Sequence, residues 1–130
     1  EREMKNILYL LIFTIIPGTA YAGERLSNDE LKSYFTGMTI TALHFMRNDP
    51  EKYFFESDGV AYKKAGSEEA VSGTWWIDET TNMICTKWNN KNKTFCFYTE
   101  LDGEGNYYQT GKTPGKVLYE IKSRQQGNQL

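Results

Sequence analysis

The stretch from residue 71 to residue 99, VSGTWWIDETTNMICTKWNNKNKTFCFYT, decides the fold. It holds three short runs rich in β-branched and aromatic residues, at 71–78, 83–88 and 94–99, separated by polar residues that favour turns. Runs of this length and composition predict β-strands, and the short gaps between them predict antiparallel pairing of consecutive strands. This part of the chain is therefore expected to form a β-meander.

Runs of the same kind lie on both sides of this stretch, at 38–47, 52–57, 60–64, 107–110 and 116–123. Eight strands within about 85 residues leave no room for crossover helices between parallel strands. The pattern predicts a mainly β fold, either a small antiparallel meander or an up-and-down, calycin-like barrel.

One short helix is predicted before the first long strand. Ser27 followed by Glu30 has the spacing of a capping box, and Leu31 begins an apolar pattern with helical spacing. Gly37 is a typical stop signal. The helix is expected over 28–36.

The N-terminal segment has the features of a secretory signal peptide. Its sequence from Met4 is MKNILYLLIFTIIPGTAYA, with an apolar run at 7–16 and small residues before a cleavage site after Ala22. The run is about half of the roughly 20 residues that a membrane-spanning helix needs, so no stable membrane anchor is expected. We expect residues 1–22 to be removed, with translation starting at Met4 and the protein in the periplasm or secreted.

Length and charge bound the rest of the chain. The 130 residues predict one β-rich domain at 23–123, and the Gln, Asn and Gly content of 124–130 predicts a flexible tail. With 15 Lys and Arg against 17 Asp and Glu, the net charge is −2, which argues against nucleic-acid binding. A monomer or weak dimer is expected.

Export changes how the two cysteines are interpreted. In an oxidising compartment Cys85 and Cys96 are expected to form a disulfide, with two free buried thiols as the alternative. If they pair across a hairpin, Ile84 lies opposite Phe97 and Thr86 lies opposite Phe95. Ile84, Trp88, Phe95 and Phe97 are then on or near one apolar face, and the cysteines are on the other.

A second hairpin is predicted at Asp58-Gly59. A two-residue turn at this point places Phe55 opposite Tyr62. In that register Tyr53, Phe55 and Tyr62 share a face.

His44 is the only histidine, which excludes most common catalytic arrangements, and no catalytic residue or cofactor is predicted. On a strand His44 shares a face with Met38, Ile40, Ala42 and Met46. The set Met38, His44 and Met46 could hold copper, because thioether and imidazole ligands suit that metal. The alternative is a barrel-interior strand with one hydrogen-bonded histidine.

The loop DGEGNY faintly resembles a calcium site, because Asp102, Glu104 and Asn106 alternate oxygen-bearing side chains. It lacks the terminal bidentate Glu of such a loop. A glycine-rich hairpin loop is the alternative interpretation.

The aromatic residues are the candidate ligand-binding or partner-binding side chains. Trp75 and Trp76 are adjacent on one strand and must point to opposite faces, so one is expected in the barrel and the other at the surface. Tyr107 and Tyr108 pose the same question. Exposed Trp and Tyr are typical of binding surfaces. The candidate binding residues are Trp75, Trp76, Trp88, Tyr107 and Tyr108.

The order of motifs resembles the small exported proteobacterial proteins grouped as domain of unknown function 995. The motifs are the short helix, Gly37-Met38-Thr39, Tyr53-Phe54-Phe55 with Asp58-Gly59, Gly73-Thr74-Trp75, Cys85-x-x-Trp88 and Cys96. The resemblance spans roughly 31–110. It implies a periplasmic or secreted β-rich domain with paired cysteines, and it supplies no activity or catalytic residues.

These features predict an exported, non-enzymatic binding domain for a protein or a small apolar or aromatic ligand. One alternative is an inhibitor of an envelope-directed enzyme such as a lysozyme, for which Asn89 to Lys93 is the candidate inserting loop. Others are a small envelope hydrolase and a lipocalin-like carrier. A carrier needs an unfilled interior, which so many aromatic residues are expected to fill.

Overall fold

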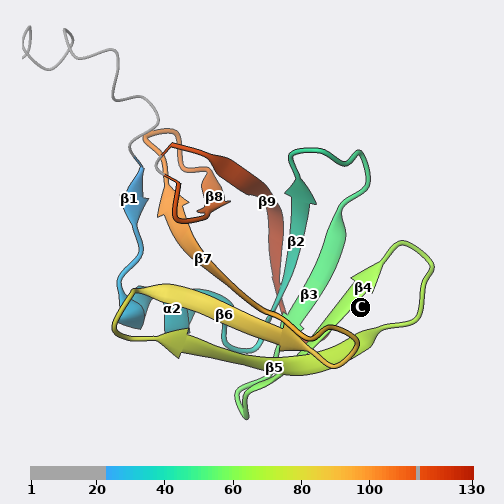
Figure 1. The fold of residues 1–130 in the computed structure, drawn as a ribbon. Helices are drawn as coiled ribbons and strands as arrows, with labels where there is room; N and C mark the ends of the chain where they lie inside the picture. Colours follow the sequence, from blue (N-terminus) through green and yellow to red (C-terminus); the bar gives the residue numbers. More distant parts are fainter. Residues whose placement is uncertain (1–22, 114) are drawn as a thin grey trace, which may run out of the picture.

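The computed structural model describes residues 23–113 and 115–130 (Figure 1). The expected signal peptide, residues 1–22, lies outside the described residues. In chain order the elements are β1 Glu24–Arg25, α2 Asn28–Phe35, β2 Met38–His44, β3 Glu51–Phe55, β4 Val60–Ala65, β5 Val71–Asp78, β6 Met83–Trp88, β7 Thr94–Leu101, β8 Tyr107–Thr110 and β9 Val117–Gln126.

The strands form an antiparallel barrel. Each strand from β2 to β9 pairs with the next, and β9 pairs back with β2, so that eight strands close the sheet on itself. The short β1 pairs with the C-terminal half of β7, beside Glu100 and Leu101, whereas β6 pairs with the N-terminal half. The small up-and-down barrel with one helix is confirmed.

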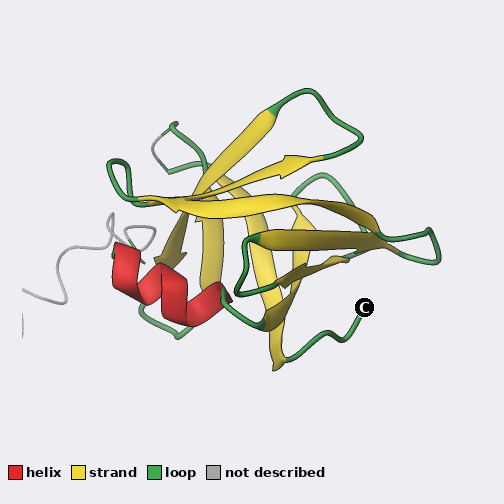
Figure 2. Cartoon of the chain, turned by 90° about the horizontal axis from the view of Figure 1, so that it is seen from below, coloured by secondary structure: helices red, strands yellow, loops and turns green. Residues whose placement is uncertain are grey.

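The helix α2 covers one end of the barrel (Figures 1 and 2). Its capping box is present, since the Glu30 N–H donates to Ser27 Oγ at 3.2 Å and the Ser27 N–H donates to Glu30 Oε1 at 3.0 Å. Leu31 and Phe35 point inward and are fully buried in the main core. The helix ends at Phe35, one residue before the expected end.

The strand directions define a closed end and an open end. The helix α2 and the β3–β4, β5–β6 and β7–β8 loops lie at the closed end. The open end is formed by the β2–β3, β4–β5, β6–β7 and β8–β9 loops. The buried core occupies the closed end and the middle of the barrel, and it includes Leu31, Phe35, Ile40, Phe55, Trp75 and Ile84.

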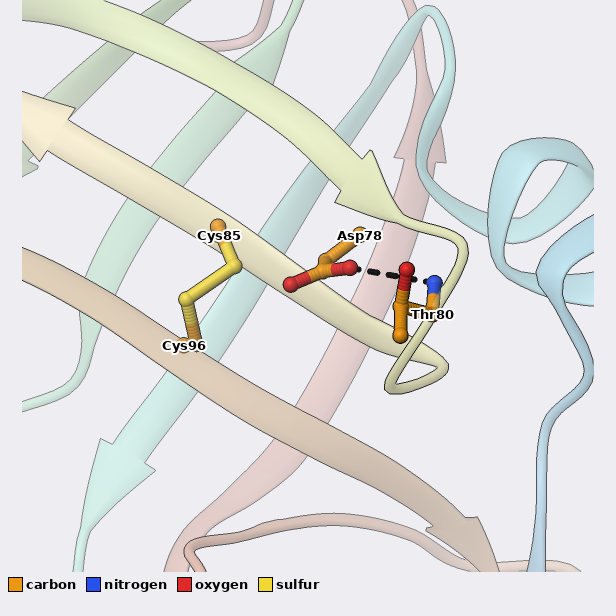
Figure 3. Close-up of a disulfide and its surroundings, with 4 residues drawn as sticks. All are labelled: Asp78, Thr80, Cys85 and Cys96. Carbon is orange, nitrogen blue, oxygen red and sulfur yellow. Dashed lines mark hydrogen bonds between the residues drawn. A yellow bond between two sulfur atoms is a disulfide. The ribbon is translucent and has the colours of Figure 1, made fainter.

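The disulfide is confirmed, and so is the register that it predicts. Cys85 and Cys96 are paired residues of β6 and β7, with a 2.06 Å bond between their sulfur atoms. Ile84 lies opposite Phe97 and Thr86 lies opposite Phe95, as expected. Figure 3 shows the bridge linking the two neighbouring strands.

The predicted register of the β3–β4 hairpin is wrong by one residue. Phe55 pairs with Ala61, and Phe54 pairs with Tyr62. The loop holds three residues, because Gly59 has φ of +92° and its N–H donates to the Glu56 carbonyl at 3.1 Å, as in a turn that ends in a glycine bulge. Tyr62 therefore points away from the face that Tyr53 and Phe55 share.

The predicted boundary between the domain and a flexible tail, at residue 124, lies too early in the chain. β9 continues to Gln126, which pairs with Met38. Gly127 and Gln129 then bond β2 and its start, through the Gly37 carbonyl at 2.9 Å and Thr39 Oγ1 at 2.9 Å. The polar composition of this segment predicts a tail, but the backbone of β2 needs a partner to close the barrel.

Candidate functional site

The interior of the barrel is not completely filled. A cavity of about 200 Å³ lies between the core and the open end. Ala42 and Thr86 point into it, and their small side chains leave space that larger residues would occupy. The expectation that aromatic side chains fill the interior is therefore wrong. An eight-stranded barrel is just wide enough for side chains to fill it, so two small inward residues suffice to open a cavity.

Seven of the sixteen residues that line the cavity are aromatic, and they include its floor. Phe35 of α2 lies beneath it, with its ring centroid 5.3 Å from that of Phe55. Tyr53 and Trp88 lie at a centroid distance of 6.0 Å across β3 and β6. Aromatic walls of this kind favour planar or apolar ligands.

The open end of the cavity is polar and charged. Arg47 of the β2–β3 loop donates to Glu51 Oε1 at 2.7 Å, and Glu51 is 7% exposed. Lys63 reaches the cavity from β4, and Lys91 reaches it from the β6–β7 loop. The cavity therefore has an apolar floor and a charged rim.

Two tyrosines stand between the apolar and charged parts. Tyr53 of β3 and Tyr119 of β9 both line the cavity. Burial raises the phenolic pKa of Tyr53 well above its usual value, and Tyr119 and Glu51 raise it further. Burial and the Glu51 carboxylate also raise the phenolic pKa of Tyr119. Both phenols stay protonated at neutral pH and can donate hydrogen bonds.

Lys63 is the cation of the cavity wall that comes from a strand, whereas Arg47 and Lys91 come from loops. It is half-buried and lies opposite Tyr53, with Nζ 5.2 Å from the centroid of the Trp88 ring. Desolvation lowers the pKa of its ammonium, and the Glu51 carboxylate partly offsets that effect. The ammonium is therefore poorly hydrated, and the Trp88 ring gives it a cation–π contact.

Only Trp88 among the five predicted aromatic binding residues lines this cavity. Trp75 is buried below it, and its indole N–H donates to the Glu56 carbonyl at 2.7 Å. Trp76 is 40% exposed on the outer face, as expected for one residue of the adjacent pair.

The tyrosine pair also divides between the faces. Tyr107 packs on Tyr34 of α2 at a centroid distance of 4.5 Å, at the closed end. Tyr108 pairs with Glu120 across β8 and β9 and lies on the outer face beside Asp102. Neither residue belongs to the cavity.

The possible copper set is not brought together. Met38 and His44 are the first and last residues of β2, and at the usual rise per residue they lie roughly 20 Å apart. Met46 follows the end of the strand and is 76% exposed. The His44 ring packs against Tyr119 at 5.0 Å, and its Nδ1 accepts from the Met46 N–H at 3.2 Å.

The loop with alternating oxygen-bearing side chains is an internally bonded turn. Asp102 Oδ1 accepts from the backbone N–H groups of Glu104 and Asn106 at 2.8 and 2.9 Å. The bond from Asn106 is the main reason why the pKa of Asp102 is lowered. No cluster of three or more His, Cys, Asp and Glu suited to a metal occurs within 23–113 and 115–130.

Sequence reasoning missed the polar rim of the cavity. Alternation along β3 identifies Glu51 and Tyr53 as neighbours of Phe55 on the inner face. The register error in the β3–β4 hairpin placed Tyr62 inside, and therefore placed Lys63 outside. Recognising Gly59 as a bulge residue would have corrected the hairpin and revealed Lys63.

A second, shallow cleft of about 650 Å³ runs along the outside of α2 beside β9. Arg124 already binds the helix there, since it donates to the carbonyls of Tyr34 and Ser33 at 2.8 and 3.1 Å. The cleft has the character of a helix-packing seam, and the deeper cavity inside the barrel is the stronger candidate site.

No helix in the described part of the chain is both long enough and apolar enough to cross a membrane. The disulfide fits an oxidising compartment. Comparison of the chain with protein-family models, with curated proteins and with solved structures finds no match.

Proposed function

We propose that this protein is an exported, non-enzymatic binding domain that holds one small apolar or aromatic molecule inside the barrel. The observation that carries the proposal is the cavity of about 200 Å³ inside the barrel, with Phe35 as its floor and Tyr53 and Trp88 in its wall. A small apolar molecule that covers the apolar floor would remove that surface from water, which favours binding.

The volume of the cavity limits the size of the ligand. A cavity of roughly 150 Å³ lined by apolar side chains is enough to hold benzene, whereas drug-sized ligands occupy roughly 300–1,000 Å³. A space of about 200 Å³ suits a single ring or a short branched chain. A haem or the whole of a long acyl chain would not fit within this volume.

We place this activity in the periplasm or outside the cell. The support is the signal-peptide pattern of residues 1–22 and the Cys85–Cys96 disulfide, which is typical of proteins folded under oxidising conditions. The ligand would then be a molecule of the envelope or the surroundings.

A titration with benzene and indole followed by NMR tests the proposal. Saturable shifts are expected at inward residues such as Ile84 and Phe97, and none at the outward Lys87. Ala42→Leu should abolish the shifts by filling the cavity. Where leucine destabilises the fold, the smaller change Ala42→Val should weaken the shifts by filling part of the cavity. Thr41→Val, on the opposite face of β2, is the control.

The result that would overturn the proposal is an absence of saturable shifts at inward residues for both probes. Binding that survives in a folded Ala42→Leu variant would equally place the ligand elsewhere. Circular dichroism of each variant establishes that the barrel is intact.

A second candidate function, inhibition of a lysozyme, is supported by the β6–β7 loop. Asn89 is fixed by bonds to Ser72 at 2.9 Å, both through its backbone N–H and through its side chain, and Lys91 and Lys93 are exposed beside it. A rigid basic loop suits an acidic cleft. Lysozyme assays with purified protein and with the variant Lys91→Glu/Lys93→Glu test this candidate, which fails if the unmodified protein leaves lysozyme activity unchanged.

A further inference from the structure

Charge is distributed unevenly around the cavity. Three cationic side chains and one carboxylate line it: Arg47, Lys63, Lys91 and Glu51. The cavity therefore has a local excess of positive charge, although the chain as a whole carries a net charge of −2. Because the overall composition does not supply this positive charge, its concentration at the cavity needs a physical reason.

Glu51 does not supply the counter-ion for all of these cations. Its carboxylate is held by Arg47 at 2.7 Å, within the same loop and strand end. Across 23–113 and 115–130, Lys63 has no carboxylate within 4 Å. A half-buried ammonium without a partner is unfavourable, because it loses hydration and gains no full Coulomb interaction in return.

The surroundings of Lys63 favour a small anion as the missing partner. The electrostatic influences on Lys63 come from Glu51 and Glu68, which favour its charge, and from Arg47 and Lys91, which oppose it. The Trp88 ring stabilises the ammonium from one side. A ligand carboxylate would add a charge-assisted hydrogen bond at this point.

We infer that the molecule bound in the cavity is an amphipathic carboxylate, with its apolar body against Phe35 and Phe55 and its charged group at Lys63. This inference rests on the function proposed above. The difference between the two ends of the cavity fixes the orientation, because the apolar floor lies at the closed end and the cations lie at the open end.

The charges of the open-end loops also favour an anionic ligand, and they act on it over a longer distance. These loops carry five cations, Arg47, Lys91, Lys93, Lys112 and Lys116, against three carboxylates, Asp49, Glu68 and Glu69. A positive rim around a concave site raises the local concentration of anions and speeds their arrival. A neutral ligand would gain nothing from this arrangement.

A matched pair of probes tests the inference by calorimetry. Phenylacetate and phenylacetamide have the same ring and nearly the same shape, and only phenylacetate carries a charge. The purified protein is expected to bind phenylacetate at least about tenfold more tightly, which corresponds to about 1.4 kcal/mol. Lys63→Gln should reduce phenylacetate binding to the level of phenylacetamide.

Lys64→Gln is the control, because Lys64 lies next to Lys63 on the same strand and points to the opposite face. It should leave both affinities unchanged, and thermal melts check that both variants are folded. Equal binding of the two probes by the unmodified protein, or unchanged phenylacetate binding by Lys63→Gln, would overturn the inference.

These outcomes separate the inference from the proposed function. If benzene or indole binds in the cavity but phenylacetate does not surpass phenylacetamide, the binding function stands and the carboxylate inference fails. If none of these ring probes binds, the proposed function fails and the inference fails with it.

Discussion

Gly73 lies directly opposite Trp88 in the β5–β6 pair, and the Trp88 ring covers the space that a side chain on Gly73 would need. A Cβ at Gly73 would lie 2.9 Å from the Trp88 Cα and 3.0 Å from a carbon of its ring, and it would collide with the Lys87 carbonyl. The glycine of the Gly-Thr-Trp motif therefore has a structural cause, since the β6 backbone and the Trp88 ring both approach it too closely for a side chain.

Gly73→Ala should destabilise the barrel and displace the cavity wall. Overpacking at this contact is expected to cost about 1–3 kcal/mol in the free energy of unfolding, measured by urea denaturation. Ligand binding should weaken as well, because Trp88 lines the cavity. Thr74→Ala, at the adjacent exposed position, is the control and should change stability by less. A Gly73→Ala protein as stable as the unmodified one would contradict this account of the motif.

Removal of the disulfide should lower stability without closing the cavity. The bridge spans a sequence separation of 11 residues, and the chain-entropy argument gives a loss of about 3 kcal/mol for the double variant Cys85→Ser/Cys96→Ser. Because Cys85 and Cys96 are on the outer face, benzene binding should persist under conditions where the variant is folded. Alkylation without reductant should leave the mass of the unmodified protein unchanged, and two adducts would show that the thiols are free.

Tyr34 should titrate apart from the exposed tyrosines. Burial at the closed end, together with the neighbouring Tyr107, raises its phenolic pKa to about 12. A group whose pKa is raised by folding stabilises the protein fully below its unfolded value, near 10, and that stabilisation is lost as the pH rises through the folded value. Stability should therefore fall between about pH 10 and pH 12.

Ultraviolet absorbance of tyrosinate measures this titration. Tyr34→Phe should remove a step near pH 12 and make the folded state less sensitive to alkali in that window. Tyr62→Phe, on the outer face of β4, is the comparison. A titration of Tyr34 near pH 10 in the folded protein would contradict the burial of Tyr34 at the closed end.

Glu51→Gln should tighten the binding of phenylacetate. The substitution removes the only carboxylate that lines the cavity among the described residues, and it leaves the shape of the side chain nearly unchanged. A several-fold gain for phenylacetate and little change for phenylacetamide are expected by calorimetry. Lys91→Glu, which replaces a positive charge at the open end with a negative one, should weaken phenylacetate binding. No response to either change would show that the field of the rim does not act on the ligand.

Local patterns in the sequence predict much of this fold. Ser27 and Glu30 place the start of the helix through a capping interaction within four residues. Cys85 and Cys96 fix the β6–β7 register, because a covalent link allows little freedom in how two strands pair. In both cases the decisive interaction is short in range or covalent.

The remaining features depend on interactions that no local pattern records. The Asp58-Gly59 signal is compatible with a turn of two or three residues, and one residue of difference moves Lys63 from the outside to the cavity. The cavity itself depends on how inward side chains from many strands fill a common volume. Ala42 and Thr86 appear unremarkable in their own strands and acquire meaning only when the barrel closes.

The position of α2 at one end of the barrel determines how a ligand would exchange. Since α2 covers one end, a ligand of the proposed kind would leave by the same opening through which it entered, and a second molecule could not push it through. Exchange is then a sequence of release followed by capture, so the replacement rate is limited by spontaneous departure and does not rise with competitor concentration. A partner that delivered or collected such a ligand would approach the four loops of the open end.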